Sequence, residues 1–165
     1  MMKKSVQILL VMVLFITMEF TNADRHANMT LNNSETFGLF RAAHDASLQV
    51  KPDALSEGLI VFDRTKARET MMQTLSMNMG LKPDLKPKED SYLTDPVEIL
   101  FEDYVDDESG VSFPYNYRND QYKIYKTIWG PAVIYEIRIK TPRSSTFSYD
   151  GYIYKNIIQE YPFPY

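Results

Sequence analysis

The sequence predicts an α+β fold in which a long N-terminal helix, followed by a second short helix, carries an antiparallel sheet of about four strands. Three observations predict it. An apolar run follows two lysines at the N-terminus, a second apolar pattern then continues at helical spacing to Val50, and the apolar period becomes two only in the second half of the chain. We therefore expect residues 1–23 to form a signal or membrane-anchor segment and residues 24–165 to form one extracytoplasmic α+β domain packed on the helix.

The composition limits the possible functions. The chain has 165 residues, of which 44% are hydrophobic, and this is enough for a hydrophobic core. The formal net charge of -4 argues against nucleic-acid binding, because neutralising phosphates requires a basic patch. The chain contains no cysteine, which excludes disulfides and thiolate metal sites and favours a bacterial exported protein.

The N-terminal segment has the layout of an export signal, with lysines before an apolar run from Val6 to Phe20. Cleavage after Ala23 is favoured by the shortness of this run, since a membrane-spanning helix needs about 20 apolar residues. Retention as an anchor is favoured by continuity, since residues 5–37 contain neither proline nor glycine. Both interpretations remain open, and in both the lysines place the N-terminus in the cytoplasm.

The first helix of the domain is predicted over residues 34–50. Its small residues allow another element to approach closely, and Lys51-Pro52 ends it because the residue before proline avoids helical angles. The positions that we expect it to bury recur at helical spacing: Phe37, Phe40, Ala43, Ser47 and Val50, with Leu39, Ala42 and Ala46 beside them.

A second helix is predicted between an N-cap at Asp63 and a stop at Gly80. The apolar run Gly58–Phe62 before it is either a strand or an extended connector. Residues 82–95 contain two prolines and mixed charge, which indicates a linker. The stripe of the second helix, which we interpret as core, is Ala67, Met71, Leu75 and Met79.

Alternating patterns predict strands over residues 97–101, 111–117, 122–128, 132–140 and 151–159. An acidic turn is expected between the first two, over residues 102–110, and Pro114 suits an edge strand. The strand at 132–140 has the clearest alternation, with charged residues on one face. Its apolar face is expected to contain Val133, Tyr135, Ile137 and Ile139.

Several segments carry a family resemblance: residues 40–50, 58–63, 66–67, 75–81 and 130–143. On these, the chain resembles the pilin-like exported proteins of Gram-positive bacteria and is similar in layout to tight-adherence minor pseudopilins. The resemblance implies a membrane helix that continues outside the membrane under a small sheet, in an assembly component and not an enzyme. The chain lacks the pilin pattern of a glycine cleavage site and a glutamate five residues into the apolar run, since Glu19 lies at its far end. Processing by a prepilin peptidase, and entry into a filament, remain open.

Two groups of residues invite a chemical interpretation. His44-Asp45 lies in a patterned element, but the two histidines are too far apart for a zinc site and no serine is indicated as a nucleophile. An acidic cluster lacks the EF-hand spacing for calcium, so we expect a solvated turn. We expect no catalytic residue, no metal and no cofactor. The members of the acidic cluster are Glu102, Asp103, Asp106, Asp107 and Glu108.

An aromatic cluster in the strand region is the candidate interface. Tyrosine and tryptophan are enriched at protein interfaces and also stack on sugars, but they are equally common in strands, so interface and core both remain open. The residues of this possible interface are Tyr115, Tyr117, Tyr122, Tyr125 and Trp129.

The leading hypothesis is a membrane-anchored, extracytoplasmic, pilin-like protein that acts through contacts with other proteins of a surface or secretion apparatus. The alternative is a cleaved, secreted binding module that uses the aromatic sheet face on cell-wall carbohydrate. A hydrolase is the least favoured hypothesis. The expected partners are the membrane, through the N-terminal helix, and other proteins of a surface assembly, with no nucleic acid.

Overall fold

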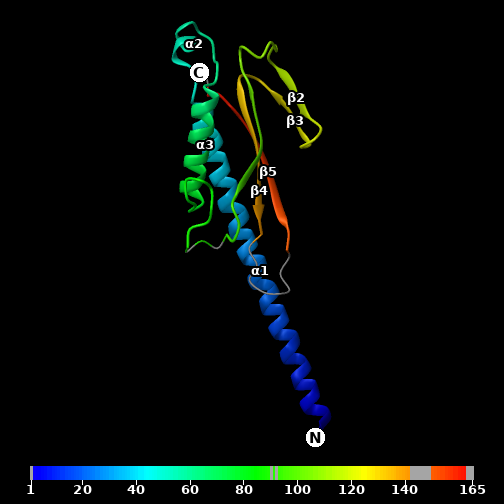
Figure 1. The fold of residues 1–165 in the computed structure, drawn as a ribbon. Helices are drawn as coiled ribbons and strands as arrows, with labels where there is room; N and C mark the ends of the chain where they lie inside the picture. The colour runs from blue at the N-terminus through cyan, green and yellow to red at the C-terminus, as the bar shows by residue number, and fades with distance from the viewer. Residues whose placement is uncertain (1, 90, 92, 142–149, 163–165) are drawn as a thin grey trace.

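The computed structural model describes residues 2–89, 91, 93–141 and 150–162, and it confirms the α+β class. Figure 1 shows one long helix, a second helix along its C-terminal half, and strands on the other side. The helices are α1 (Met2–Ser47), α2 (Pro52–Ser56) and α3 (Arg64–Asn78). The strands are β1 (Glu98–Val105), β2 (Tyr115–Asn119), β3 (Ile124–Ile128), β4 (Ala132–Lys140) and β5 (Tyr152–Glu160).

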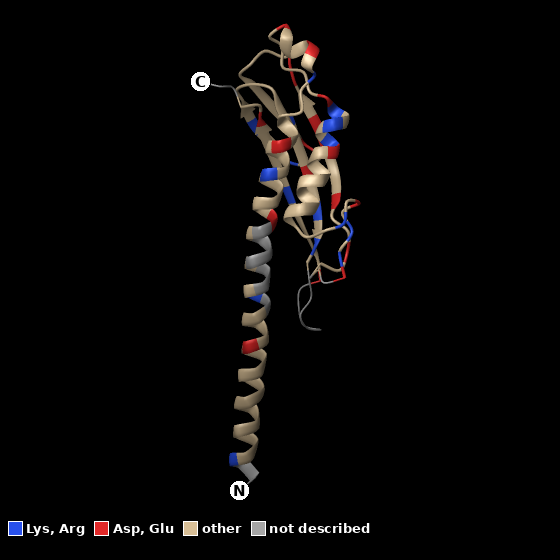
Figure 2. Cartoon of the chain, turned by 90° about the vertical axis from the view of Figure 1, so that its left-hand side faces the viewer, with Lys and Arg blue, Asp and Glu red and all other residues tan. Residues whose placement is uncertain are grey.

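Helix α1 is one uninterrupted element of 46 residues. At a rise of 1.5 Å per residue it is roughly 70 Å long. Its N-terminal part projects away from the remainder of the chain and carries few charges, whereas its C-terminal part lies within the folded head (Figure 2). The predicted continuity of the apolar leader with the first helix of the domain is therefore confirmed.

The buried stripe of α1 agrees with the predicted one except at Phe37 and Phe40, and at Val50, which is partly buried. Phe37 and Phe40 are 68% and 52% exposed, and Val50 lies beyond the helix, where it forms a bridge with Phe62. The reason is the close approach of α3, since a Cβ atom added at Gly38 would lie 3.2 Å from the side chain of Met79. Small side chains fit this contact and phenylalanine does not. The residues that α1 buries here are Leu39, Ala42, Ala43, Ala46 and Ser47.

The ends of the helices follow the predicted signals. Lys51 is extended, with φ -68° and ψ 121°, and Pro52 begins α2, a short helix that the pattern did not predict. Asp63 caps α3, its side chain accepting a hydrogen bond from Lys66 N at 3.1 Å. Gly80 has φ +64°, the left-handed conformation that glycine adopts readily, directly after the end of α3.

The strands form two sheets, where about four strands in one sheet were expected. One is antiparallel with the order β1-β4-β5, and the other is the hairpin β2-β3. The predicted strands at 111–117 and 122–128 are shifted, because the hairpin pairs Tyr115 with Ile128 and Asn119 with Ile124. The turn predicted from residue 102 is wrong in its first part, since β1 continues to Val105. The charges in this part of β1 have partners: Arg68 pairs with Glu102 at 2.6 Å.

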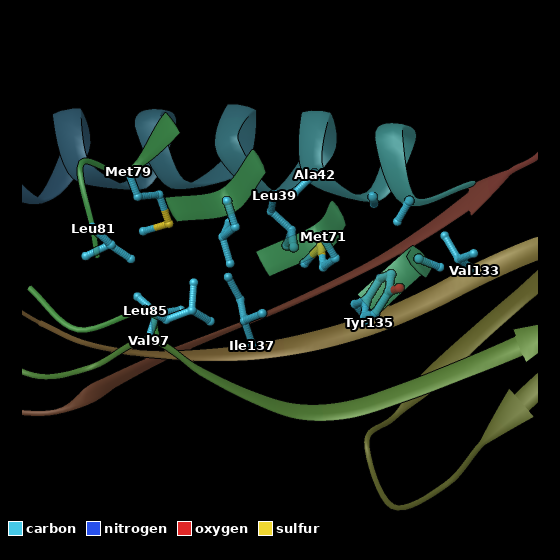
Figure 3. Close-up of a cluster of buried hydrophobic side chains, with 14 of the residues drawn as sticks. Leu39, Ala42, Met71, Met79, Leu81, Leu85, Val97, Val133, Tyr135 and Ile137 are labelled. Atoms are coloured by element: carbon cyan, nitrogen blue, oxygen red, sulfur yellow. The ribbon is translucent and has the colours of Figure 1, made fainter. Parts of the chain in front are cut away.

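The main core lies between the two long helices and the inner face of the sheet. Figure 3 shows Leu39 and Ala42 of α1 near Met71 of α3, with Tyr135 and Ile137 of β4 opposite them. The predicted apolar face of β4 is confirmed, because all four of its residues are fully buried. A second cluster lies under the hairpin on the outer face of the sheet and contains Val105, Tyr117, Ile124, Ile128, Ala132 and Ile134.

Candidate interaction surfaces

The first candidate surface is the apolar N-terminal part of α1. The segment Lys4–Ala23 has 20 residues and a mean hydropathy of 1.8, is exposed throughout, and is long and apolar enough to cross a membrane. A signal sequence near an N-terminus has the same properties. A helix that exposes apolar side chains all round favours an apolar environment, and this segment is compatible with a membrane span or a signal sequence.

The second candidate surface is the outer face of the β2-β3 hairpin. It carries two residues of the predicted interface, Tyr125 and Trp129, which are 59% and 72% exposed. Ile124 and Ile128 point inward, so Tyr125 lies on the opposite face of β3, because side chains alternate along a strand. Tyr125 lies within β3, and Trp129 follows directly after its last residue, Ile128. We call the exposed surface around these two residues the aromatic platform.

Polar contacts hold this platform in shape. Tyr125 Oη and Arg118 Nε both donate to Asp120 Oδ1, at 3.0 and 2.8 Å, and the guanidinium carbon of Arg118 lies 5.7 Å from the Tyr125 ring centroid. The hydrogen bond to the Asp120 carboxylate raises the pKa of Tyr125. Thr127 Oγ1 donates to Asn116 Oδ1 at 2.7 Å. The Tyr125 ring is thus fixed before any ligand arrives.

The other three residues of the predicted interface are placed differently. Tyr117 is 7% exposed, and its hydroxyl donates to Asp103 Oδ2 at 2.7 Å. The hydroxyl of Tyr122 donates to a main-chain carbonyl of β1 at 3.1 Å, and its ring stacks on Phe101 with centroids 4.7 Å apart. Tyr115 is half-buried against the second core cluster. These three side chains attach the hairpin to the sheet.

The acidic cluster is not a solvated turn throughout: the prediction is wrong for Asp106, which is buried, whereas Asp107 and Glu108 are exposed and lie in the turn. Asp106 is 1% exposed and accepts hydrogen bonds from Phe62 N at 3.2 Å and from Ser109 Oγ at 2.9 Å. Asp107 Oδ2 accepts from Ile60 N at 2.6 Å. The cause is the extended connector at 58–62, whose main-chain N–H groups need acceptors. In the described part of the chain, no group of three or more histidines and acidic residues could hold a metal ion.

The neighbours of His44 are engaged elsewhere. Ser47 Oγ donates to the main-chain carbonyl of His44 at 2.7 Å, and Asp45 Oδ2 accepts from Thr74 Oγ1 of α3 at 2.8 Å. Neither side chain is therefore arranged as in a serine-histidine-aspartate site. Asp45 instead links α1 to α3.

Glu35 is a buried carboxyl group that the sequence pattern did not single out. It is fully buried, and neither carboxylate oxygen has a hydrogen-bond partner among the described residues. Burial raises its pKa to about 7, opposed in part by the charge of Lys155 on β5, whose Nζ donates to Thr36 at 2.7 Å. The available signal was spacing, because Glu35 lies four residues before Leu39 on the stripe that α1 buries.

Comparison of the chain with protein-family models, with curated proteins and with solved structures finds no match. The functional argument therefore depends on the surfaces themselves. The structure combines an apolar rod, an exposed aromatic platform on the hairpin and an open edge of the main sheet. The first can contact a lipid bilayer, and the other two lie on the folded head, where they can contact other molecules.

Proposed function

We propose that this is a membrane-anchored, extracytoplasmic, pilin-like protein that acts through contacts with other proteins of a surface or secretion apparatus. The observation that carries the proposal is the continuity of α1. The same helix contains the exposed apolar segment Lys4–Ala23 and the residues Leu39, Ala42 and Ala46, which are buried in the core of the head. Anchor and head are therefore one element, which favours retention of the leader over its removal.

The geometry of the rod suits such a role. The lysines before the apolar segment favour a cytoplasmic N-terminus, which leaves the head outside. Between this segment and Glu35, the residues of α1 span roughly 17 Å at 1.5 Å per residue. This length raises the head above the lipid headgroups, where its sides can contact neighbouring proteins.

Membrane fractionation tests the anchor. We expect the full-length chain in the membrane fraction after alkaline carbonate washing. The double variant L10R/L14R should leave that fraction, because each arginine at the centre of a spanning helix costs about 3 kcal/mol. The matched control is L48R, which places the same charge on an exposed leucine of the region after α1. Wild-type chain in the soluble cytosol would disprove the proposal.

A second candidate function is supported by the exposure of Trp129 and Tyr125 in the aromatic platform. In it, the leader is cleaved, and the secreted head binds cell-wall carbohydrate by stacking sugar rings on this platform. A new N-terminus at Asp24, found by mass spectrometry of the mature protein, would favour this function over the anchored one.

Co-sedimentation with purified cell walls tests the platform. If the second function is correct, W129A and Y125A should each weaken wall binding about tenfold, because truncated aromatic anchors carry much of an interface's affinity. M77A is the control, since Met77 is 73% exposed on α3, away from the hairpin. Absence of wild-type binding to any wall polymer would eliminate the carbohydrate function.

A further inference from the structure

Strand β5 is an edge strand with one open side. It pairs with β4 over its nine residues without a shift in register, and no other described strand pairs with it. At its two ends, Thr141 N donates to Gly151 O at 3.0 Å, and Tyr161 N donates to Pro131 O at 2.7 Å. Hydrogen-bonded and non-bonded pairs alternate in an antiparallel ladder. The odd-numbered residues of β5 therefore bond to β4, and the even-numbered ones direct their main-chain groups to the open side.

A side-chain contact agrees with this assignment. Lys126 Nζ of β3 donates to the main-chain carbonyl of Ile158, an even-numbered residue, at 3.4 Å. The hairpin thus covers the open side at the C-terminal end of β5. Toward the N-terminal end, no described residue bonds to the open-side main chain of Tyr152, Tyr154 or Asn156. This half of the strand offers donors and acceptors to an incoming chain.

In its N-terminal half, the open side lacks the usual protection of an edge among the described residues. Natural edge strands are commonly blunted by proline, by bulges or by lysine side chains. β5 contains neither proline nor a bulge, and its one lysine, Lys155, donates to Thr36 of α1 at 2.7 Å. Tyr152 and Tyr154 are 42% and 56% exposed on the outer face. In its N-terminal half, the edge therefore has aromatic side chains above it and main-chain groups to which no described residue bonds.

Helix α1 presents exposed apolar side chains beside this edge. Phe40 lies one turn after Thr36, on the same flank of α1, because residues four apart share a helix face. Since Thr36 contacts Lys155, this flank borders β5. Phe40 and its neighbour Phe37 are more than half exposed. A strand added to β5 would place one row of side chains over this flank and the other beside the two tyrosines.

We infer that the open side of β5 binds an extended polypeptide segment of a partner protein, which adds a strand to the β1-β4-β5 sheet. An extended chain is the ligand that presents N–H and C=O groups alternately at the spacing of a strand edge, and this mode of recognition recurs in peptide-binding domains. The segment has apolar side chains at alternate positions, to match Phe40 on one side and Tyr152 on the other. The inference rests on the proposed function, for which it names the class of partner.

A peptide-binding measurement on the full chain in detergent micelles tests this inference. The probe is a fluorescein-labelled peptide with the sequence of residues 132–140, because this segment forms a strand and has apolar side chains at alternate positions. N156P removes a main-chain donor from the open side without breaking a bond to β4, and should weaken binding about tenfold. N156A loses the same side chain but keeps the donor, and should bind like wild type. No binding to wild type, or equal binding to the two variants, would overturn the inference.

Two further measurements keep the test decisive. If N156P fails to fold, a probe methylated on alternate main-chain nitrogens replaces it, and undiminished binding of this probe to wild type would overturn the inference. The second measurement is the oligomeric state as a function of concentration. If wild type and N156A dimerise and N156P does not, the inference of a foreign partner is overturned, and the strand is added by a second copy of this chain. Failure of peptide binding leaves membrane fractionation unaffected, so the proposed function is tested separately.

Discussion

Replacing Asp106 with alanine is expected to lower the free energy of unfolding by about 3 kcal/mol, the largest loss that we expect from a single polar side chain. Its carboxylate accepts from Phe62 N, Glu108 N and Ser109 Oγ. Because Asp106 is almost fully buried, water cannot replace these bonds without opening the structure. The connector at 58–62 would lose one of its two carboxylate acceptors.

Thermal unfolding followed by near-ultraviolet circular dichroism measures this effect. E108A is the matched control, since the Glu108 side chain is 63% exposed and pairs with Lys51 at 3.4 Å on the surface. Such a pair contributes between 0 and about 1 kcal/mol. Hydrogen exchange adds a local measurement, because the amide of Phe62 should lose its protection in D106A alone. Equal effects of D106A and E108A would show that the buried carboxylate does not hold the connector.

Replacing Glu35 with methionine is expected to stabilise the protein by about 3 kcal/mol at pH 8. The carboxyl is fully buried without a hydrogen-bond partner among the described residues, and its pKa is about 7 in the folded state against an ordinary 4.5. Methionine has a similar length and no charge, and it suits an apolar site with imperfect packing. The gain is the removed cost of ionising a buried group.

The raised pKa of Glu35 determines how the stability of the wild type changes with pH. Below pH 4.5 Glu35 is protonated in both states, so its ionisation costs no stability. Between pH 4.5 and about 7 the unfolded chain ionises while the folded chain stays protonated, so wild-type stability falls as pH rises. Above that range the cost is constant. The stability difference between E35M and wild type should therefore grow across this window and then level off.

Urea or thermal unfolding between pH 4 and pH 8 checks this window. E35Q should also remove the pH dependence that Glu35 causes. Its free energy of unfolding should rise less than that of E35M, because the variant buries a polar amide. E69Q is the control, because Glu69 is exposed on α3, and its pH profile should follow that of wild type. A wild-type profile that is parallel to that of E35M would contradict the assignment of a buried, protonated carboxyl to Glu35.

The elements of the fold were predictable where the signal was local. The rod, the cap at Asp63 and the inner face of β4 follow from periodicity and from residues that start or stop helices. The stripe of α1 was predicted wrongly only at Phe37 and Phe40, because the apolar pattern favours phenylalanine, whereas the close contact with α3 admits only small side chains beside Leu39. The distance between α1 and α3 depends on both helices, so the apolar pattern of α1 alone does not predict it.

The candidate surfaces were predictable only in part, for the same reason. The aromatic cluster was found by composition, but the division between exposed Trp129 and buried Tyr117 depends on how the hairpin lies on the sheet. Asp106 and Asp107 bind main-chain groups 44 and 47 residues away, so no local spacing indicates their role. Whether β5 has an open side depends on the order of the strands in the sheet. The alternation of residues within one strand does not determine that order.

The continuity of α1 has a mechanical consequence. A pull on the head is transmitted along one column of main-chain hydrogen bonds into the apolar segment, without a joint that could absorb it. Because the stretch around Ala42 and Ala46 is held by α3 and the sheet, tension cannot draw the rod out of the head without separating that packing. Under the proposed membrane anchoring, the rod is a stiff tether, whose resistance to load depends on the packing around Ala42 and Ala46 as much as on the lipid.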